Sequence, residues 1–251
     1  MVAMGFVAMG ISCIGQQNFI IGRPPGWATE VNPLLANILG PIVIFCGLLI
    51  LIKKRGDIAA FAIAALVLVF ALPSHFMHFM DDWANVYKSI FLFGGAVITG
   101  VSLIDNATFT LPETVKRKVI FISSVLMTSF FVVSGYAHIK YADFVATLIP
   151  AFIPFPVFWT YFCGVCLIFG AIGMLIPQTR KLASLLSALM VFCWFLLLHL
   201  PRVIENPAEI GERLGLFESF TFAGMLFTLT ALIRVKEGTK TIAAEPRQSA
   251  Y

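Results

Sequence analysis

Long runs without Asp, Glu, Lys or Arg make up most of the sequence and leave few folds open to it. A helix needs about 20 apolar residues to cross the hydrocarbon core of a bilayer. One charge at the middle of such a helix costs about 2.5–3.5 kcal/mol on insertion scales, so charge-free runs near this length indicate membrane spans. The runs are continuous rather than alternating, which favours helices over a β-barrel. They cover residues 1–22, 31–52, 58–80, 89–104, 119–139, 144–179, 182–201 and, interrupted by Glu218, 214–233.

The composition excludes the other broad classes of protein. Of the 251 residues, 59% are hydrophobic and 12% are charged, and the mean hydropathy is +0.94. A soluble domain has about 45–50% apolar and about 25% charged residues, and disorder needs low hydrophobicity with high charge. The net charge of +4 comes without a basic cluster interleaved with aromatic residues, so we expect no nucleic-acid partner. The expected partner is the lipid bilayer.

Two of the runs need a closer interpretation. Residues 144–179 are too many for one crossing, and Pro150, Pro154 and Pro156 divide them. Because proline breaks helices, we predict an irregular or interfacial stretch up to Pro156 and a helix over about 157–176. Residues 1–22 resemble a signal peptide in length but lack its positively charged start, so we predict a retained helix.

The basic residues predict the orientation of the chain. Most of the 17 Lys and Arg residues fall in loops and a tail on the side of the N-terminus, and such loops lie in the cytoplasm. Both termini are therefore predicted to be cytoplasmic. The four tryptophans would then lie in or near the outer interface as an aromatic belt; they are Trp27, Trp83, Trp159 and Trp194.

The chain resembles itself at a shift of 124 residues. Gly40 then matches Gly164 and His75 matches His199, while a shift of 120 matches Gly15 with Gly135. Each repeat contains four helices, so both copies cross in the same direction, as in folds with a pseudo-two-fold along the membrane normal. We predict an all-α integral membrane protein of eight transmembrane helices in two four-helix repeats. The predicted units are a first repeat at 1–105, a cytoplasmic linker at 106–118, a second repeat at 119–236 and a disordered tail at 237–251.

A Pro-rich helix entry, a Gly-bearing helix and a basic turn stand out in the second half. The stretches are Ser134-Gly135-Tyr136-Ala137-His138, Phe144-Val145, Leu148-Ile149-Pro150, Ile153-Pro154-Phe155-Pro156, Gly164 and 175–183. Through them, most of residues 119–203 resembles the DoxX-like family of small four-helix membrane proteins. Residues 15–22 and 40–55 resemble the same unit more weakly. The chain departs from the family's usual single unit by carrying two.

The resemblance implies a plasma (inner) membrane protein connected with redox work. Some members of the family are subunits of a thiosulfate:quinone oxidoreductase or belong to thiol and oxidative-stress systems. It therefore implies a quinone- or thiol-linked oxidoreductase accessory subunit with a polar site near the outer face. A quinone is the implied cofactor ahead of haem, and a membrane or extracytoplasmic redox protein is the implied partner. The alternative is a non-catalytic module that binds or transports a small molecule.

Few ionisable residues lie in the predicted spans, and the four histidines lie near their outer ends. His75 and His78 are spaced i, i+3, so they share a helix face, and Asp82 extends that face if the helix continues. Arg202 matches His78 in the second repeat, and an acceptor-rich and a cation-bearing copy could meet across the pseudo-axis. The candidate ligand-binding residues are His75, His78, Asp82, His138, His199, Arg202 and Glu218.

Three interpretations of these residues compete. In the first, they bond loop backbone or lipid headgroups, as long polar side chains do at an interface. In the second, His75 and His199 ligate a metal or haem, because they lie at equivalent depths on different helices. In the third, the residues line an outward-facing pocket for a quinone or another small molecule. Glu218 belongs to this pocket if it lies inside the last span, and to the interface if that helix starts later.

The cysteines offer a separate candidate. Cys163 and Cys166 have the spacing of a dithiol–disulfide pair, which needs one thiol activated by a helix N-terminus or a nearby cation. Both lie inside an apolar run, where cysteine normally packs as a small hydrophobic residue. No catalytic residue follows from this, and Cys163 and Cys166 stay the redox candidates. The sequence has no P-loop, no dinucleotide-binding glycine motif and no zinc-protease motif.

Overall fold

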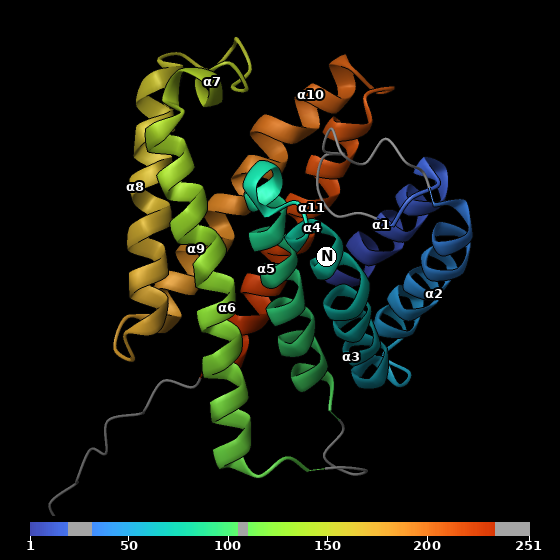
Figure 1. Cartoon of the computed structure of the whole chain (residues 1–251). Helices are drawn as coiled ribbons and strands as arrows, with labels where there is room; N and C mark the ends of the chain where they lie inside the picture. Colours follow the sequence, from blue (N-terminus) through green and yellow to red (C-terminus); the bar gives the residue numbers. More distant parts are fainter. Residues whose placement is uncertain (20–31, 105–109, 234–251) are drawn as a thin grey trace, which may run out of the picture.

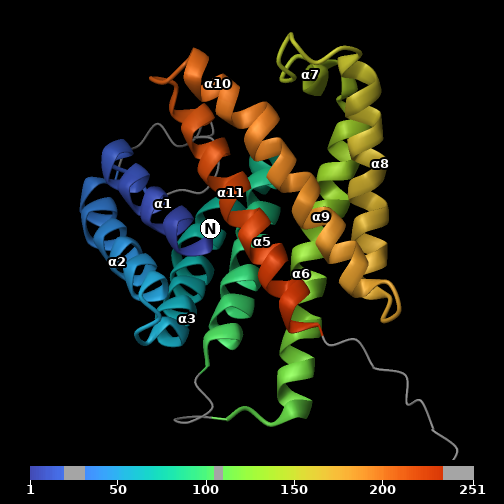
Figure 2. The same ribbon diagram turned by 180° about the vertical axis from the view of Figure 1, so that it is seen from behind.

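The computed structural model describes residues 1–19, 32–104 and 110–233, and within these ranges all regular structure is helical (Figures 1 and 2). Seven helical segments of the described chain are long and apolar enough to cross a membrane. This confirms the predicted all-α, multi-span architecture. The segments are α2 (Pro33–Leu51), α3 to α4 (Gly56–Phe76), α5 (Phe79–Leu103), α6 (Glu113–Lys140), α8 (Pro156–Leu175), α9 to α10 (Arg180–Glu205) and α11 (Ile210–Leu232).

The first helix is shorter than predicted from its apolar run. Helix α1 (Val2–Gln16) has 15 residues, which extend to about 22 Å, less than the roughly 30 Å of hydrocarbon. It ends where Gln17 takes a left-handed conformation with φ 55°. Residues 20–22 of the run, Trp27, part of the linker and the tail 237–251 lie outside the described residues.

Two long segments contain a π-helical turn just before a proline. The first is built from α3 (Gly56–Leu66), η2 (Val67–Ala71) and α4 (Leu72–Phe76). The second is built from α9 (Arg180–Trp194), η3 (Phe195–His199) and α10 (Leu200–Glu205). Pro73 and Pro201 follow these turns. Because proline has no N–H for the carbonyl four residues earlier and its ring clashes with it, a wider turn lets the helix continue.

Helix α5 starts ten residues before the charge-free run 89–104 from which it was predicted. Helical structure is interrupted at Met77 and His78, and α5 begins at Phe79. Its first turns contain Asp82, whose φ of −133° and ψ of 23° are not helical. Charged residues near the start of the helix hid this part of the span.

The connection before α8 has the predicted irregular form. It contains the short helix α7 (Ala142–Ala146) and turns that end at Phe155, which is left-handed with φ 58°. Helix α8 then starts at Pro156, where proline is tolerated because the first N–H groups of a helix have no intrahelical partner. Helix α6 starts at Glu113, inside the residues assigned to the linker.

The helices pack in an interleaved order. Helix α1 contacts α2 and also α11, the last helix, while α6 contacts α8 and also α5. Helices α5 and α11 meet at the centre, where the rings of Phe91 and Phe222 stack with centroids 4.2 Å apart. Close approach depends on Gly95 of α5, because an added Cβ would lie 2.1 Å from the sulfur of Met225. This central contact positions the polar residues described next.

Candidate functional site

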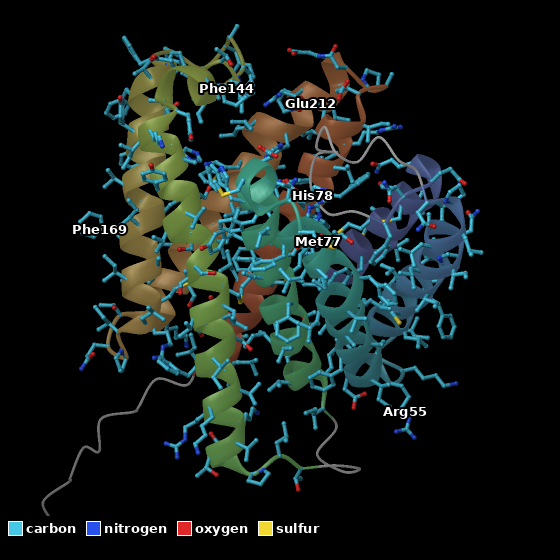
Figure 3. The ribbon with its side chains drawn as sticks, in the orientation of Figure 1. Arg55, Met77, His78, Phe144, Phe169 and Glu212 are labelled. Atoms are coloured by element: carbon cyan, nitrogen blue, oxygen red, sulfur yellow. The ribbon has the colours of Figure 1, made fainter. Side chains whose placement is uncertain are left out.

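The structure gathers polar side chains where α4 and the start of α5 face α11. We call this group the buried polar cluster; it consists of His75, Asp82, Asn85, Lys88 and Glu218. Figure 3 shows the neighbouring His78 on the half of the bundle nearer Glu212 and Phe144, with Arg55 at the opposite end. The cluster thus lies away from the basic turn between α2 and α3.

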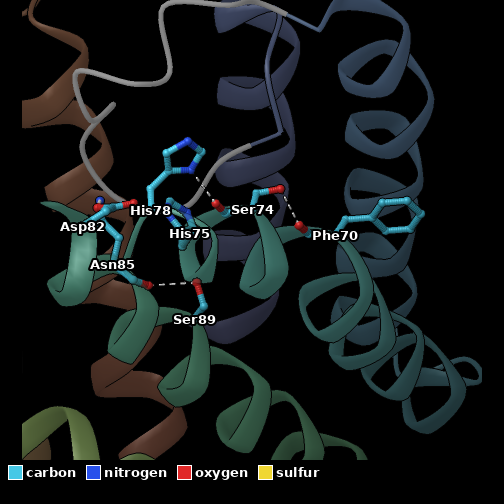
Figure 4. A network of polar contacts seen from close by, with 7 residues as sticks. All are labelled: Phe70, Ser74, His75, His78, Asp82, Asn85 and Ser89. Carbon is cyan, nitrogen blue, oxygen red and sulfur yellow. Dashed lines mark hydrogen bonds and ion pairs between the residues drawn. The ribbon is translucent and has the colours of Figure 1, made fainter. Parts of the chain in front are cut away.

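His75 and Asp82 form the core of the cluster. The His75 side chain is completely buried, and its Nδ1 bonds Oδ2 of Asp82. The other carboxylate oxygen, Oδ1, accepts a hydrogen bond of 2.7 Å from Nδ2 of Asn85. The hydroxyl of Ser89 donates to the Asn85 carbonyl at 2.8 Å (Figure 4). Both oxygens of the buried carboxylate are therefore occupied, as burial of a charge requires.

The break between α4 and α5 makes this contact possible. His75 is near the end of α4, the chain turns at Met77 and His78, and Asp82 lies in a non-helical conformation within the first turns of α5. His75 and His78 were predicted to share a helix face that Asp82 would extend if the helix continued; α4 ends at Phe76, so this condition is not met. His78 instead donates from Nδ1 to the Ser74 carbonyl at 3.1 Å (Figure 4).

An ion pair links the two halves of the chain inside the bundle. Nζ of Lys88 on α5 donates to Oε2 of Glu218 on α11 at 2.8 Å. Their side chains are 23% and 5% exposed, and both charges are close enough to act electrostatically on His75. Glu218 therefore lies inside α11 and is buried.

The second carboxylate oxygen of Glu218, Oε1, takes no part in this ion pair. Its Oε1 is buried and has no hydrogen-bond partner within the described part of the chain. A buried acceptor without a donor costs about 1–3 kcal/mol, more for a charged group, so such an atom in a native structure calls for an explanation. A hydroxyl or an amide of a bound molecule would supply the missing donor.

Two further residues of α11, Glu212 and Gly215, contact Arg202 of α10 and His199 of η3. Arg202 of α10 donates to Glu212 at 2.5 Å and to the Leu148 carbonyl at 3.2 Å. The His199 ring lies against Gly215, where an added Cβ would be 2.9 Å from Nδ1. Since Glu212, Gly215 and Glu218 are spaced by three residues on α11, His199 lies about one turn from the cluster. The expected meeting of Arg202 with the first repeat's acceptors is wrong, because its acid is Glu212.

The other candidates lie between α6, α8 and α9. The His138 ring stacks on Trp194, with centroids 5.8 Å apart, and its Nδ1 donates to the Ser134 carbonyl at 2.7 Å. Cys163 and Cys166 are half-buried free thiols on α8, and Cys163 contacts Trp194. His138 and the two cysteines thus share a packing region that is separate from the buried polar cluster.

The described residues contain no group of three or more His, Cys, Asp or Glu side chains arranged to hold a metal ion. His75 and His199 also have different neighbours, since His75 bonds Asp82 and His199 packs on Gly215. The structure adds nothing to the interpretation of this pair as metal or haem ligands.

Sequence reasoning missed Asn85, Lys88 and Glu212. A signal for Asn85 was present, because Asp82, Asn85 and Ser89 are spaced i, i+3, i+7 on one helix face. The pairing of Lys88 with Glu218 joins residues 130 positions apart, so it depends on how α5 and α11 pack and has no local signal.

Comparison with protein-family models matches part of the chain. A family model described as a domain of unknown function (DUF8561) matches residues 127–205, from within α6 to the end of α10. No curated protein and no solved structure matches the chain. The matched range contains His138, His199, Arg202, Cys163 and Cys166 but none of the residues of the buried polar cluster.

Proposed function

We propose that the protein is a DoxX-like redox component of the plasma membrane that binds a quinone or quinol at the buried polar cluster. The observation that carries the proposal is the buried Oε1 of Glu218, which lacks a donor among the described residues. A quinol hydroxyl is such a donor, and hydrogen bonds to charged groups contribute about 1.5–3 kcal/mol. An intramembrane acid is a functional candidate by default.

The cluster also fits the proton chemistry of this reaction. Conversion of a quinone to a quinol takes up two electrons and two protons, and the reverse reaction releases them. His75 with Asp82, and Glu218 with Lys88, are two acid–base pairs that can hold or pass a proton. The electrons would come from or go to a membrane or extracytoplasmic redox partner.

The two-repeat architecture is part of the proposal, and the packing supports it. In each half, the first helix crosses the second at a pair of glycines: Gly10 with Gly40, and Gly135 with Gly164. An added Cβ at Gly40 would be 3.0 Å from the Gly10 carbonyl oxygen, and one at Gly164 would be 3.2 Å from that of Gly135. Gly10 is therefore a better match for Gly135 than Gly15, at which an added Cβ meets nothing within 4 Å.

The interleaved contacts repeat in the same way. The first helix of each half packs on the last helix of the other, α1 on α11 and α6 on α5. On this basis we propose two four-helix units, with α1 as a shortened eighth member. The π-helical turns Val67–Ala71 and Phe195–His199 are offset by 128 residues rather than 124. The third helices of the two units are therefore equivalent at a shift about one helical turn larger than the shift that pairs His75 with His199.

The proposed topology places both termini in the cytoplasm. The turn between α2 and α3, the start of α6 and the turn between α8 and α9 lie at one end of the bundle (Figure 1). These segments contain Lys53 to Arg55, Lys116 to Lys118, and Arg180 with Lys181. Basic residues gathered at one end favour that end as cytoplasmic, and the buried polar cluster would then open toward the outer side.

Binding of a short-chain quinol to the purified full chain tests the function. Quenching of tryptophan fluorescence should saturate, and Glu218→Gln should weaken binding about tenfold, since it replaces a charged acceptor. Glu205→Gln is the matched control because Glu205 is an exposed acid at the end of α10. Binding that does not saturate, or that is equally weakened by both substitutions, would refute the quinol site.

A second candidate function is transport of a small molecule. The pair of Lys88 and Glu218 joins the two halves inside the bundle, and transporters built from repeats place their sites at the repeat interface. Release of a labelled quinol from proteoliposomes, with its catalysed oxidation measured in parallel, separates the two functions. Flux without a redox change would favour transport.

A thiol-linked reaction would use Cys163 and Cys166 instead. Both are free thiols in the structure, and reaction requires one of them to become a thiolate. Trapping with a maleimide after oxidation and after reduction tests this route. Equal labelling in both states would exclude it.

A further inference from the structure

A cleft between α5 and α6 lies outside the buried polar cluster. It has a volume of about 300 Å³ and is lined mainly by aromatic side chains, among them Phe79, Trp83, Tyr87, Tyr136 and Tyr141. Farther along, α5 and α6 pack closely, since an added Cβ at Gly94 would be 3.1 Å from the Ser123 carbonyl oxygen. The cleft residues lie near the start of α5 and the end of α6, opposite the basic start of α6.

A lysine lies at the edge of this cleft over two aromatic rings. Nζ of Lys140 is 5.4 Å from the ring centroids of both Tyr136 and Tyr141. Tyr141 in turn stacks on Trp83, with centroids 6.5 Å apart and an interplanar angle of 25°. The rings hold the ammonium group in one place while leaving it exposed, since cation–π contacts at exposed sites contribute about 0.5–1 kcal/mol.

In the described part of the chain, the charge of Lys140 is not matched by an acid. Lys88 and Arg202, which lie toward the same end of the bundle, pair with Glu218 and Glu212. Within residues 1–19, 32–104 and 110–233, no carboxylate lies within 4.0 Å of Lys140. A fixed cation beside an apolar, aromatic cleft is complementary to a molecule with an anionic head and an apolar body.

We propose that this cleft binds one anionic phospholipid, with its phosphate at Lys140 and its chains along the exposed apolar side chains beside the cleft. Trp and Tyr residues favour the headgroup level of a bilayer, which places the ammonium at the depth of lipid phosphates. The small volume suits a headgroup, with the acyl chains remaining outside among other lipids. Met80, which is 85% exposed, provides part of the apolar surface that the chains would cover. The proposal does not depend on the quinol site.

Native mass spectrometry of the full chain in detergent tests this site. Equal amounts of phosphatidylglycerol and phosphatidylcholine with the same acyl chains are added, and the bound lipids are counted. The wild-type chain should retain phosphatidylglycerol preferentially. Lys140→Gln should reduce that preference about fivefold, the factor expected for one basic residue near an anionic surface. Lys140→Arg should keep it.

Lys181→Gln is the matched control, because it removes the same charge from an exposed position at the start of α9, at the opposite end of the bundle. It should leave the preference unchanged. A preference that survives Lys140→Gln, or falls equally in the control, overturns the proposal. Glycerol phosphate, compared with sodium chloride at equal ionic strength, separates the two sources of phosphate: specific displacement of the lipid would assign the site to a soluble phosphate and overturn the lipid assignment.

Discussion

Gly135→Ala tests the glycine crossing between α6 and α8 on which the proposed two-unit architecture rests. An added Cβ at this position would lie 2.8 Å from the Gly164 carbonyl oxygen and 2.7 Å from Cγ1 of Ile168. Ordinary contacts begin at 3.4 Å, and a backbone carbonyl cannot rotate away as a side chain can. The two helices must therefore move apart along their contact.

The expected loss follows from two opposing effects. Overpacking of a well-packed interior costs about 1–3 kcal/mol, while replacing glycine by alanine in a helix interior gains about 0.8–1.0 kcal/mol. Gly170→Ala is the matched control, since its added Cβ meets the Ser187 hydroxyl at 2.7 Å, a group that rotates. Because the propensity gain is common to both substitutions, the difference between them isolates the overpacking, about 1–3 kcal/mol.

Reversible unfolding in mixed micelles of a mild detergent and sodium dodecyl sulfate measures this difference. Tryptophan fluorescence and far-ultraviolet circular dichroism report the transition, and the free energy of unfolding is compared among wild type, Gly135→Ala and Gly170→Ala. We expect Gly135→Ala to be the less stable variant. Equal free energies for the two variants would show that the helices do not approach each other as described.

Three further predictions use the same unfolding measurement. Lys88→Ala should lower the free energy of unfolding more than Glu218→Ala does, by up to roughly 3–5 kcal/mol. It leaves Glu218, which is only 5% exposed, without its cation, whereas Glu218→Ala leaves Lys88, which is 23% exposed and can reach water. The reverse order would contradict the ion pair. Asp82→Ala should lower the free energy of unfolding by about 1–3 kcal/mol, because it removes the carboxylate that bonds the His75 imidazole and the Asn85 amide. A loss as small as that of Asp81→Ala, at an exposed position, would argue against the cluster. Asn32→Ala should cost about 1 kcal/mol because its side chain accepts a hydrogen bond from the third residue of α2 at 3.1 Å, and no loss would mean that this cap does not hold the helix.

The long apolar helices could be predicted from the sequence because their signal is local. Helices α2 and α8 begin and end within two residues of the predicted limits, since hydrophobic runs and prolines determine these limits. The start of α5 was missed for a physical reason. Charges such as Asp82 and Lys88 argue against a span in an isolated helix, but inside a bundle they are tolerated when they find partners.

The candidate site could be predicted only in part. His75, Asp82 and Glu218 were candidates from their place in or near apolar runs, with Glu218 left open between the last span and the interface, and the structure brings these residues together. His138 belongs to a different helix contact. The sequence carries no signal for this separation, because it depends on which helices become neighbours rather than on which residues lie at the same depth.

The contact of α1 with α11 has a consequence for the order of assembly. Gly5 of α1 lies directly against Thr221 of α11, yet nearly two hundred residues separate the two helices. At 5–20 residues per second, the last helix emerges from the ribosome roughly 10–40 s after the first. For that time the surface of α1 that packs on α11 lacks this partner, so α1 cannot finish packing before the last helix arrives. The final helix of the chain contacts α1, α5 and α9, so it completes the packing of helices from the start, the middle and the end of the chain.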